Sequence, residues 1–104
     1  MVVRNISDAT IEQVLMLGKS AIIDFWAPWC QPCRHLGPII EAIAEANPDI
    51  EVCKINIEEN PKAVLTHKVH SIPVVLFFKD GEIVHRLVGL QSQETLQGII
   101  DKEL

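Results

Sequence analysis

The fold of this chain is decided by residues 21–33, which read Ala-Ile-Ile-Asp-Phe-Trp-Ala-Pro-Trp-Cys-Gln-Pro-Cys. Residues 21–26 are almost continuously apolar, which is typical of a strand covered on both faces of a sheet. A short loop follows, and apolar residues then recur at helical spacing through about Ala46, at Leu36, Ile39, Ile40 and Ile43. The pattern predicts a buried strand that runs into a helix, with two cysteines at the junction.

The rest of the chain continues this alternation of strands and helices. Further strands are predicted at residues 2–6, 50–57, 74–79 and 83–88. Helices are predicted around Ile11–Leu15, at 61–67 and after Ser92, with N-cap candidates at Ser7, Asp8, Asn60 and Ser92. Asp80-Gly81 signals a tight hairpin between the last two strands. The order β-α-β-α-β-α-β-β-α predicts an α/β fold, in which helices cover both faces of a mainly parallel sheet and one antiparallel hairpin is added.

Length and composition restrict the class of protein. The 104 residues suffice for one domain, and no linker or repeat divides residues 1–104. The net charge of −5 argues against a nucleic-acid partner, and no apolar run approaches the ~20 residues of a membrane span. Three cysteines are too few for a secreted disulfide framework, and Arg4 and Asp8 interrupt any signal-like start. A reducing, cytoplasmic location is therefore expected.

The sequence Cys30-Gln31-Pro32-Cys33 carries the sharpest chemical signal. Cysteines at positions i and i+3 of a first helical turn lie close enough to close a small disulfide ring. The helix N-terminus offers unpaired N–H groups and partial positive charge, which stabilise a thiolate. Cys30 is therefore predicted to be the exposed nucleophile, and Cys33 the resolving thiol beneath the helix. Pro32 fits a position where the helix leaves a donor unpaired.

A structural zinc site is the competing interpretation of the two cysteines. Such a site needs four ligands, usually from a second Cys or His pair. Only Cys53 and scattered histidines remain, and His35 follows Cys33 too closely to complete a zinc knuckle. The pattern favours redox chemistry, and no metal is expected.

Asp24 is an acid inside an apolar strand. Burial of a carboxylate is costly, so the expected response is a raised pKa and a group that exchanges protons near neutrality. Lys54, in the neighbouring predicted strand, is a candidate partner. The alternative is a partly solvated acid at a strand end. Its position six residues before Cys30 favours a role in proton transfer.

The dipeptide Ile72-Pro73 opens the predicted strand at 74–79. Proline cannot donate to the ladder of a sheet, so it must lie at an edge or a bend. A cis peptide bond there would turn the preceding backbone outward, with its N–H and C=O available to an extended substrate.

These motifs, taken together, resemble the thioredoxin family. The resemblance spans essentially the whole chain and is carried by residues 23–33, Pro38, Ile72-Pro73, Asp80-Gly81 and Val88-Gly89, in that order. It implies a thioredoxin fold, with a central mixed five-stranded sheet flanked by four helices. It further implies a protein-disulfide reductase that performs dithiol–disulfide exchange on cytoplasmic clients. It also implies a thioredoxin reductase as electron donor, and no cofactor beyond the Cys30–Cys33 disulfide. We expect a monomer.

The resemblance also assigns residues to roles. Cys30 matches the family's nucleophile and Cys33 its resolving cysteine, while Asp24 and Lys54 match the buried acid that assists Cys33 and the lysine beside that acid. Pro73 matches a cis-proline that faces the cysteines. The apolar patch that receives clients and the reductase is matched by Trp29, Ile57, Ile72, Val88 and Gly89, and Gln31 and Pro32 complete the predicted binding set.

The chain departs from the family pattern in three places near the site: at Gln31, at Ser71, and at His67 and His70 close to the rim. Gln31 replaces the usual glycine between the cysteines, and Ser71 stands where many members have glycine. Cys53 is expected to be a small buried hydrophobe, and His67 and His70 to be solvated loop residues.

Two other functions are compatible with such a fold. A disulfide oxidant or isomerase is disfavoured because Gln31-Pro32 carries neither charge nor histidine. A non-catalytic thioredoxin-like binding subunit would have no use for both Cys30 and Cys33.

Overall fold

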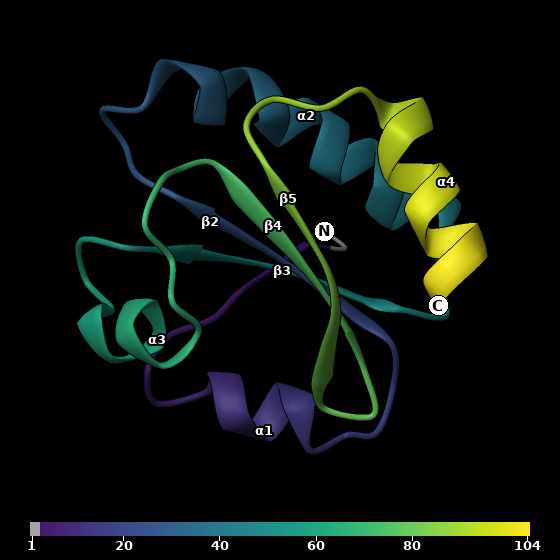
Figure 1. Ribbon diagram of the computed structural model, residues 1–104, viewed down its shortest axis with the longest axis horizontal. Helices are drawn as coiled ribbons and strands as arrows, with labels where there is room; N and C mark the ends of the chain where they lie inside the picture. Colours follow the sequence, from purple (N-terminus) through teal and green to yellow (C-terminus); the bar gives the residue numbers. More distant parts are fainter. Residues whose placement is uncertain (1–2) are drawn as a thin grey trace.

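The computed structural model describes residues 3–104, which form a five-stranded sheet flanked by four helices (Figure 1). The elements are β1 (Val3–Asn5), α1 (Ile11–Leu15), β2 (Ala21–Trp26), α2 (Gln31–Ala46), β3 (Glu51–Asn56), α3 (Pro61–Thr66), β4 (Val74–Lys79), β5 (Glu82–Val88) and α4 (Gln93–Glu103). The predicted order of elements is confirmed. Val2, the predicted start of the first strand, lies outside the described residues.

The sheet has the strand order β1-β3-β2-β4-β5. Strand β3 pairs in parallel with β1 and β2, whereas β4 runs antiparallel to both β2 and β5. The expectation of a mainly parallel sheet from the element order is therefore wrong, because β4 enters the sheet beside β2 in the opposite direction. The predicted hairpin is confirmed: Asp80 and Gly81 join β4 to β5 with φ values of 53° and 81°. Both values lie in the left-handed region that such a tight turn requires, which glycine adopts without steric cost.

The helices cover the sheet on both faces, with α2 and α4 on one side and α1 and α3 on the other (Figure 1). Successive side chains of β2 point to opposite faces. Ile22 joins the apolar core beneath α2 and α4, whereas Ile23 and Phe25 join the core beneath α1 and α3. Asp24 has the parity of Ile22, so its carboxyl points toward the α2 side.

The N-cap prediction for the first helix is wrong. Thr10 occupies that position in α1, and neither Ser7 nor Asp8 caps the helix through its side chain. The carboxylate of Asp8 instead accepts hydrogen bonds from the backbone N–H groups of Lys62 and Ala63, at 3.1 and 2.7 Å. Asp8 therefore caps α3, a helix more than fifty residues further along the chain.

Asn60 holds the N-cap position of α3, as predicted, yet its side chain does not cap the helix. The Asn60 Oδ1 atom accepts the backbone N–H of Asp8 at 2.7 Å. The side chain of Asp8 thus binds the start of α3, and the side chain of Asn60 binds the backbone of Asp8 in return. Ser92 behaves as predicted, because its hydroxyl accepts the N–H of Thr95 at the start of α4.

Within residues 3–104, no helix combines the length and the apolar character needed to span a bilayer.

We predict that Asp8→Ala lowers the free energy of unfolding by about 1–2 kcal/mol, because two N–H groups at the start of α3 lose their acceptor. Urea titration of both proteins at neutral pH measures the change. Asp49→Ala, at an exposed aspartate in the turn after α2, is the control. Equal losses in the two variants would show that the bonds from α3 to Asp8 contribute nothing.

Candidate redox site

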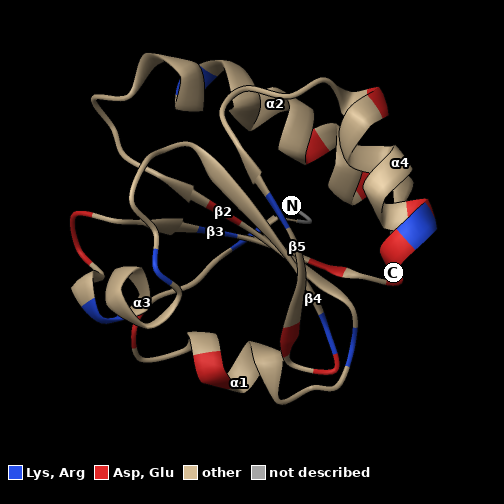
Figure 2. Ribbon diagram, viewed as in Figure 1, with Lys and Arg blue, Asp and Glu red and all other residues tan. Residues whose placement is uncertain are grey.

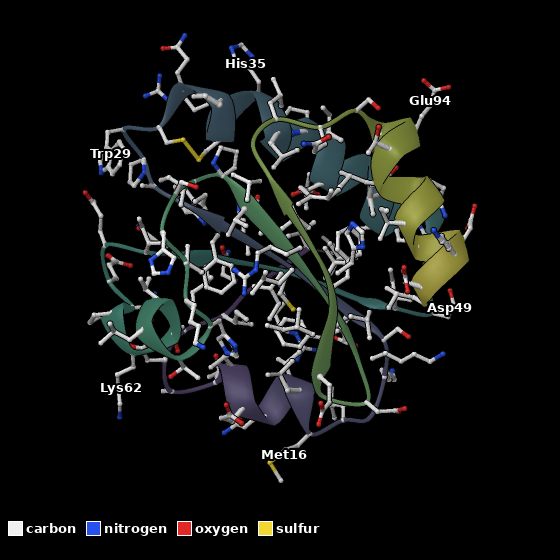
Figure 3. All side chains as sticks on the ribbon, in the orientation of Figure 1. Met16, Trp29, His35, Asp49, Lys62 and Glu94 are labelled. Carbon is white, nitrogen blue, oxygen red and sulfur yellow. A yellow bond between two sulfur atoms is a disulfide. The ribbon has the colours of Figure 1, made fainter. Side chains whose placement is uncertain are left out.

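Cys30 and Cys33 form a disulfide at the N-terminus of α2, with their Cα atoms 5.3 Å apart. Figure 3 shows this bond beside Trp29, where the loop after β2 enters the helix. Cys30 is the N-cap residue, and its Sγ accepts the backbone N–H of Cys33 at 3.3 Å. The small disulfide ring that the spacing of the two cysteines predicts is therefore confirmed.

The predicted difference in exposure between the two cysteines is wrong. Each has only 5% of its surface exposed in this oxidised state. The cause is tertiary packing: the pair lies in a small apolar cluster with Ala27, and the partly buried Ile57 and Ile72 pack against it. What distinguishes Cys30 is its place at the N-cap rather than greater exposure.

The first turn of α2 favours negative charge on Cys30. Its sulfur lies where the positive end of the helix dipole and an unpaired N–H group both point. Pro32 lies in this turn without loss of a helical bond, because a first-turn N–H has no partner within the helix. The backbone at the start of α2 thus favours a thiolate at Cys30 once the disulfide is reduced.

Asp24 is buried in the middle of β2, with 2% of its surface exposed. The alternative of a solvated acid at a strand end is therefore wrong. Burial raises the pKa of Asp24 to about 7, although the attraction of Lys54 acts in the opposite direction. Its Oδ1 atom has no hydrogen-bond partner among the described residues. A cavity of about 220 Å³ joins the two groups, since both Asp24 and Cys33 line it.

Lys54 is brought to Asp24 by the register of the sheet. The two residues are directly paired in the parallel ladder of β2 and β3, and Figure 2 shows the acidic and basic segments side by side. Paired residues in a parallel ladder project to the same face, so the ammonium and the carboxyl share one side of the sheet. The Lys54 Nζ atom also lies 5.7 Å from the centroid of the Trp26 ring, within cation–π range.

The rim of the site gathers the residues of the predicted client patch in two groups. Ile57 and Ile72 pack against the cysteines directly. Trp29 is 65% exposed, and its indole N–H donates a hydrogen bond to the Glu58 carboxylate. Gln31 is exposed at the first position of α2, with the exposed Pro32 after it.

The second group of rim residues, Val88 and Gly89, is joined to Pro73 by a backbone hydrogen bond. The Ile72-Pro73 peptide bond is cis, and Pro73 is buried immediately before β4. Its missing N–H therefore costs no ladder bond, because the strand begins at Val74. The Pro73 carbonyl accepts the N–H of Gly89 at 2.8 Å, and Val88 before that glycine is 54% exposed.

The sequence analysis missed two residues beside the site, Glu58 and Arg34. Glu58 binds Trp29, and Arg34 lines the cavity next to Asp24. An acid in a loop and an arginine on an exposed helix turn give no local signal of such contacts. Only the tertiary fold brings them there.

Cys53 and His70 lie as the sequence predicts, whereas His67 does not. Cys53 is fully buried, and burial raises the pKa of its thiol to about 11, which confirms the small buried hydrophobe. His70 is exposed, as expected. The expectation for His67 is wrong: its ring packs edge-on against Phe25 and Phe78, and burial lowers the pKa of the imidazole.

The described part of the chain contains no cluster of three or more metal-ligating side chains. The disulfide can accept two electrons and two protons and open to two thiols, and the buried carboxyl of Asp24 lines a cavity together with Cys33. Fold and site together define a thiol–disulfide oxidoreductase.

Comparison with known proteins narrows that class. The family model described as Thioredoxin matches residues 2–102. Thioredoxin 1 of Synechococcus elongatus is 41% identical over 101 residues, covering 95% of this chain and 94% of that protein. The thioredoxin of Chlamydia pneumoniae is 43% identical over 100 residues, covering 96% and 97%. The structure of a mutant thioredoxin from Halobacterium salinarum superimposes with a TM-score of 0.90 at 32% identity, covering 96% of this chain and 88% of that one.

The chain belongs to the thioredoxin family. Thioredoxins are protein-disulfide reductases, and the cysteine pair of this chain is of the redox type that they use. The redox-active group is part of the protein itself, so the reaction needs no separate cofactor. The family implies a thioredoxin reductase and disulfide-bearing substrates as partners.

We predict that Asp24→Asn stabilises the protein, and that the gain grows with pH. The folded pKa of about 7 lies above the unfolded value of 3.8, so the native state holds a proton that the unfolded state releases between these values. The free energy of unfolding of the parent therefore falls from about pH 4 to about pH 7 and then levels off. The asparagine variant lacks this decline, which amounts to at most about 4 kcal/mol.

Urea unfolding at pH 4, 6 and 8 measures this difference, because the pH dependence contributed by all other titrating groups is common to both proteins. The variant is also expected to reduce insulin more slowly, since Cys33 loses its proton acceptor. A constant stability difference across the range, with unchanged turnover, would mean that Asp24 neither titrates in it nor serves the reaction.

Proposed function

We propose that residues 1–104 form a single domain that acts in the cytoplasm, takes electrons from a thioredoxin reductase and passes them to disulfide-bearing client proteins. The observation that carries this proposal is the Cys30–Cys33 disulfide at the N-terminus of α2, with Asp24 across a cavity from Cys33. The location is supported by the small number of cysteines, three in the chain, which favours a reducing compartment.

The first chemical step is attack on the client. The Cys30 thiolate displaces one sulfur of the client disulfide, which leaves as a thiolate, and a mixed disulfide joins Cys30 to the other sulfur. The helix N-terminus stabilises the attacking thiolate before the step.

The second step resolves the mixed disulfide. Asp24 accepts the proton of the Cys33 thiol by way of the cavity that both residues line, and a pKa near 7 suits that exchange. The Cys33 thiolate then attacks Cys30 Sγ and releases the second client thiolate. The client has gained two electrons, and Cys30 and Cys33 have returned to the disulfide, which the reductase opens again.

Client docking is assigned to the rim around the disulfide. The exposed side chains of Trp29 and Val88 offer apolar area, and Ile57 and Ile72 border the sulfurs. Gln31, Pro32, Pro73 and Gly89 complete the docking surface. Lys54 acts beside Asp24, where its charge favours the ionised carboxyl after Cys33 has been oxidised.

We predict opposite defects for Cys30→Ser and Cys33→Ser in reduction of insulin by dithiothreitol. Cys30→Ser is expected to be inactive because no nucleophile remains. Cys33→Ser is expected to accumulate a mixed disulfide with insulin, visible by mass spectrometry, because the resolving thiol is missing. In the reduced parent, iodoacetamide is expected to modify Cys30 first, since its thiolate lies at the N-cap. Faster modification of Cys33 or Cys53 would contradict these roles.

We predict that Gln31→Gly lowers the reduction potential by up to about 20 mV. Glutamine at the first position of α2 has a helix propensity up to ~1 kcal/mol better than glycine, so it holds the N–H donors toward the Cys30 thiolate. For a two-electron couple, ~1.4 kcal/mol corresponds to about 30 mV. Equilibration of both proteins with a glutathione buffer measures the shift. A rise in potential, or a change beyond roughly 60 mV, would show that Gln31 acts in another way.

A further inference from the structure

A chain of hydrogen bonds connects the loop after β1 to the rim of the redox site. Asn60 Oδ1 accepts the backbone N–H of Asp8, and Asn60 Nδ2 donates to the Asn56 carbonyl at 2.8 Å. Asn56 Oδ1 in turn accepts the N–H of Glu58 at 3.0 Å. The Glu58 carboxylate accepts the indole N–H of Trp29, the residue before Cys30. Five residues from three loops are thereby linked in series.

Asn60, the central residue of this chain of hydrogen bonds, is buried, and both polar groups of its side chain are hydrogen-bonded. Asn60 is 6% exposed, and both its carbonyl and its amide group find backbone partners. A buried amide that satisfies two loops fixes their separation, because loss of either bond leaves a polar group unpaired in the interior. The carboxylate of Asp8 bonds α3 at the same time, so the loop after β1 serves as the anchor.

The segment that Asn60 holds is the one that carries the client rim. Residues 56–59 form the turn at the end of β3, and the backbone of Ile57 is bonded to the carbonyl of Trp26 at 2.9 Å. Ile57 packs against the cysteines, and Glu58 restrains the exposed ring of Trp29. The turn thus sets the relative position of two parts of the docking surface without contact between Asn60 and either sulfur.

We propose that Asn60, anchored by Asp8, is a positioning residue for client docking: it holds the turn at residues 56–59 so that Ile57 and Trp29 present one preformed surface. The proposal rests on the function proposed above. A preformed rim binds a protein client without the cost of ordering the turn on docking. A small disulfide touches only Cys30 and has no use for the rim. The two kinds of substrate therefore respond differently when the turn is released.

The test uses Asn60→Asp, which keeps the acceptor toward Asp8 and removes the donor toward the Asn56 carbonyl. Asn47→Asp is the matched control at the end of α2. Asn47 Nδ2 also donates at 2.8 Å to a carbonyl four residues earlier, that of Ile43, and its Oδ1 atom also accepts a bond, from Gln97. Kinetics of insulin reduction give KM and kcat, and the reduced proteins are also mixed with 2,2′-dithiodipyridine in a stopped-flow experiment.

For Asn60→Asp we expect a KM for insulin about threefold to tenfold higher, equivalent to one lost hydrogen bond, with the dithiodipyridine rate within about twofold of the parent. Asn47→Asp is expected to leave both within about twofold. An unchanged KM in Asn60→Asp, or an equal loss with both substrates, would overturn the proposal. A parent protein that fails to reduce insulin would instead refute the proposed function.

A second pair of variants keeps the test decisive if Asn60→Asp does not fold. Glu58 is exposed, so Glu58→Ala can release Trp29 without damage to the core. The expected result is the same rise in KM for insulin alone. Glu58→Gln, which retains an acceptor for the indole N–H, is expected to restore the parent KM. Failure of Glu58→Ala to raise KM overturns the proposal.

Discussion

Strand β2 is hydrogen-bonded on both sides, in parallel to β3 and antiparallel to β4, and the whole site is placed relative to it. It ends at Trp26, and the chain then reaches the N-terminus of α2 within a four-residue loop. Because the strand is fixed from both flanks, Cys30 has little freedom in where the helix begins. The same pairing sets Lys54 opposite Asp24, and it places β4, with Pro73 at its start, on the other side.

This arrangement leaves one carboxyl, that of Asp24, buried in the core. Asp24 shares a face of β2 with Ile22, so an apolar residue of similar volume at position 24 is expected to pack there at a gain in stability. A carboxyl with Oδ1 unpaired costs free energy that packing elsewhere must offset. In the mechanism that we propose, this carboxyl changes protonation near neutral pH and accepts the proton of the Cys33 thiol.

Periodicity and spacing predicted the features that depend on neighbouring residues in the chain. The order of strands and helices, the hairpin at Asp80-Gly81 and the disulfide ring at the start of α2 are of this kind. The pairing of Asp24 with Lys54 was also predicted, because the two residues lie at similar positions in neighbouring parallel strands of equal length.

Other features depend on segments that meet only in the folded chain. Asp8 has the local signature of a cap for α1 and yet caps α3, because the loop after β1 passes that helix. The burial of Cys30 depends on the arrival of Ile57 and Ile72. No pattern in residues 21–33 contains that information.

The burial of Cys53 has a consequence for how the protein withstands oxidants. Its thiol is covered on β3 beneath α1 and α3, and a raised pKa keeps it protonated at neutral pH. Peroxide attacks thiolates that it can reach, and a sulfenic acid with no neighbouring thiol proceeds to irreversible products. Oxidation is therefore directed to Cys30, where Cys33 closes a disulfide that a reductant can open. Each molecule exchanges two electrons per cycle, and its third cysteine is spared.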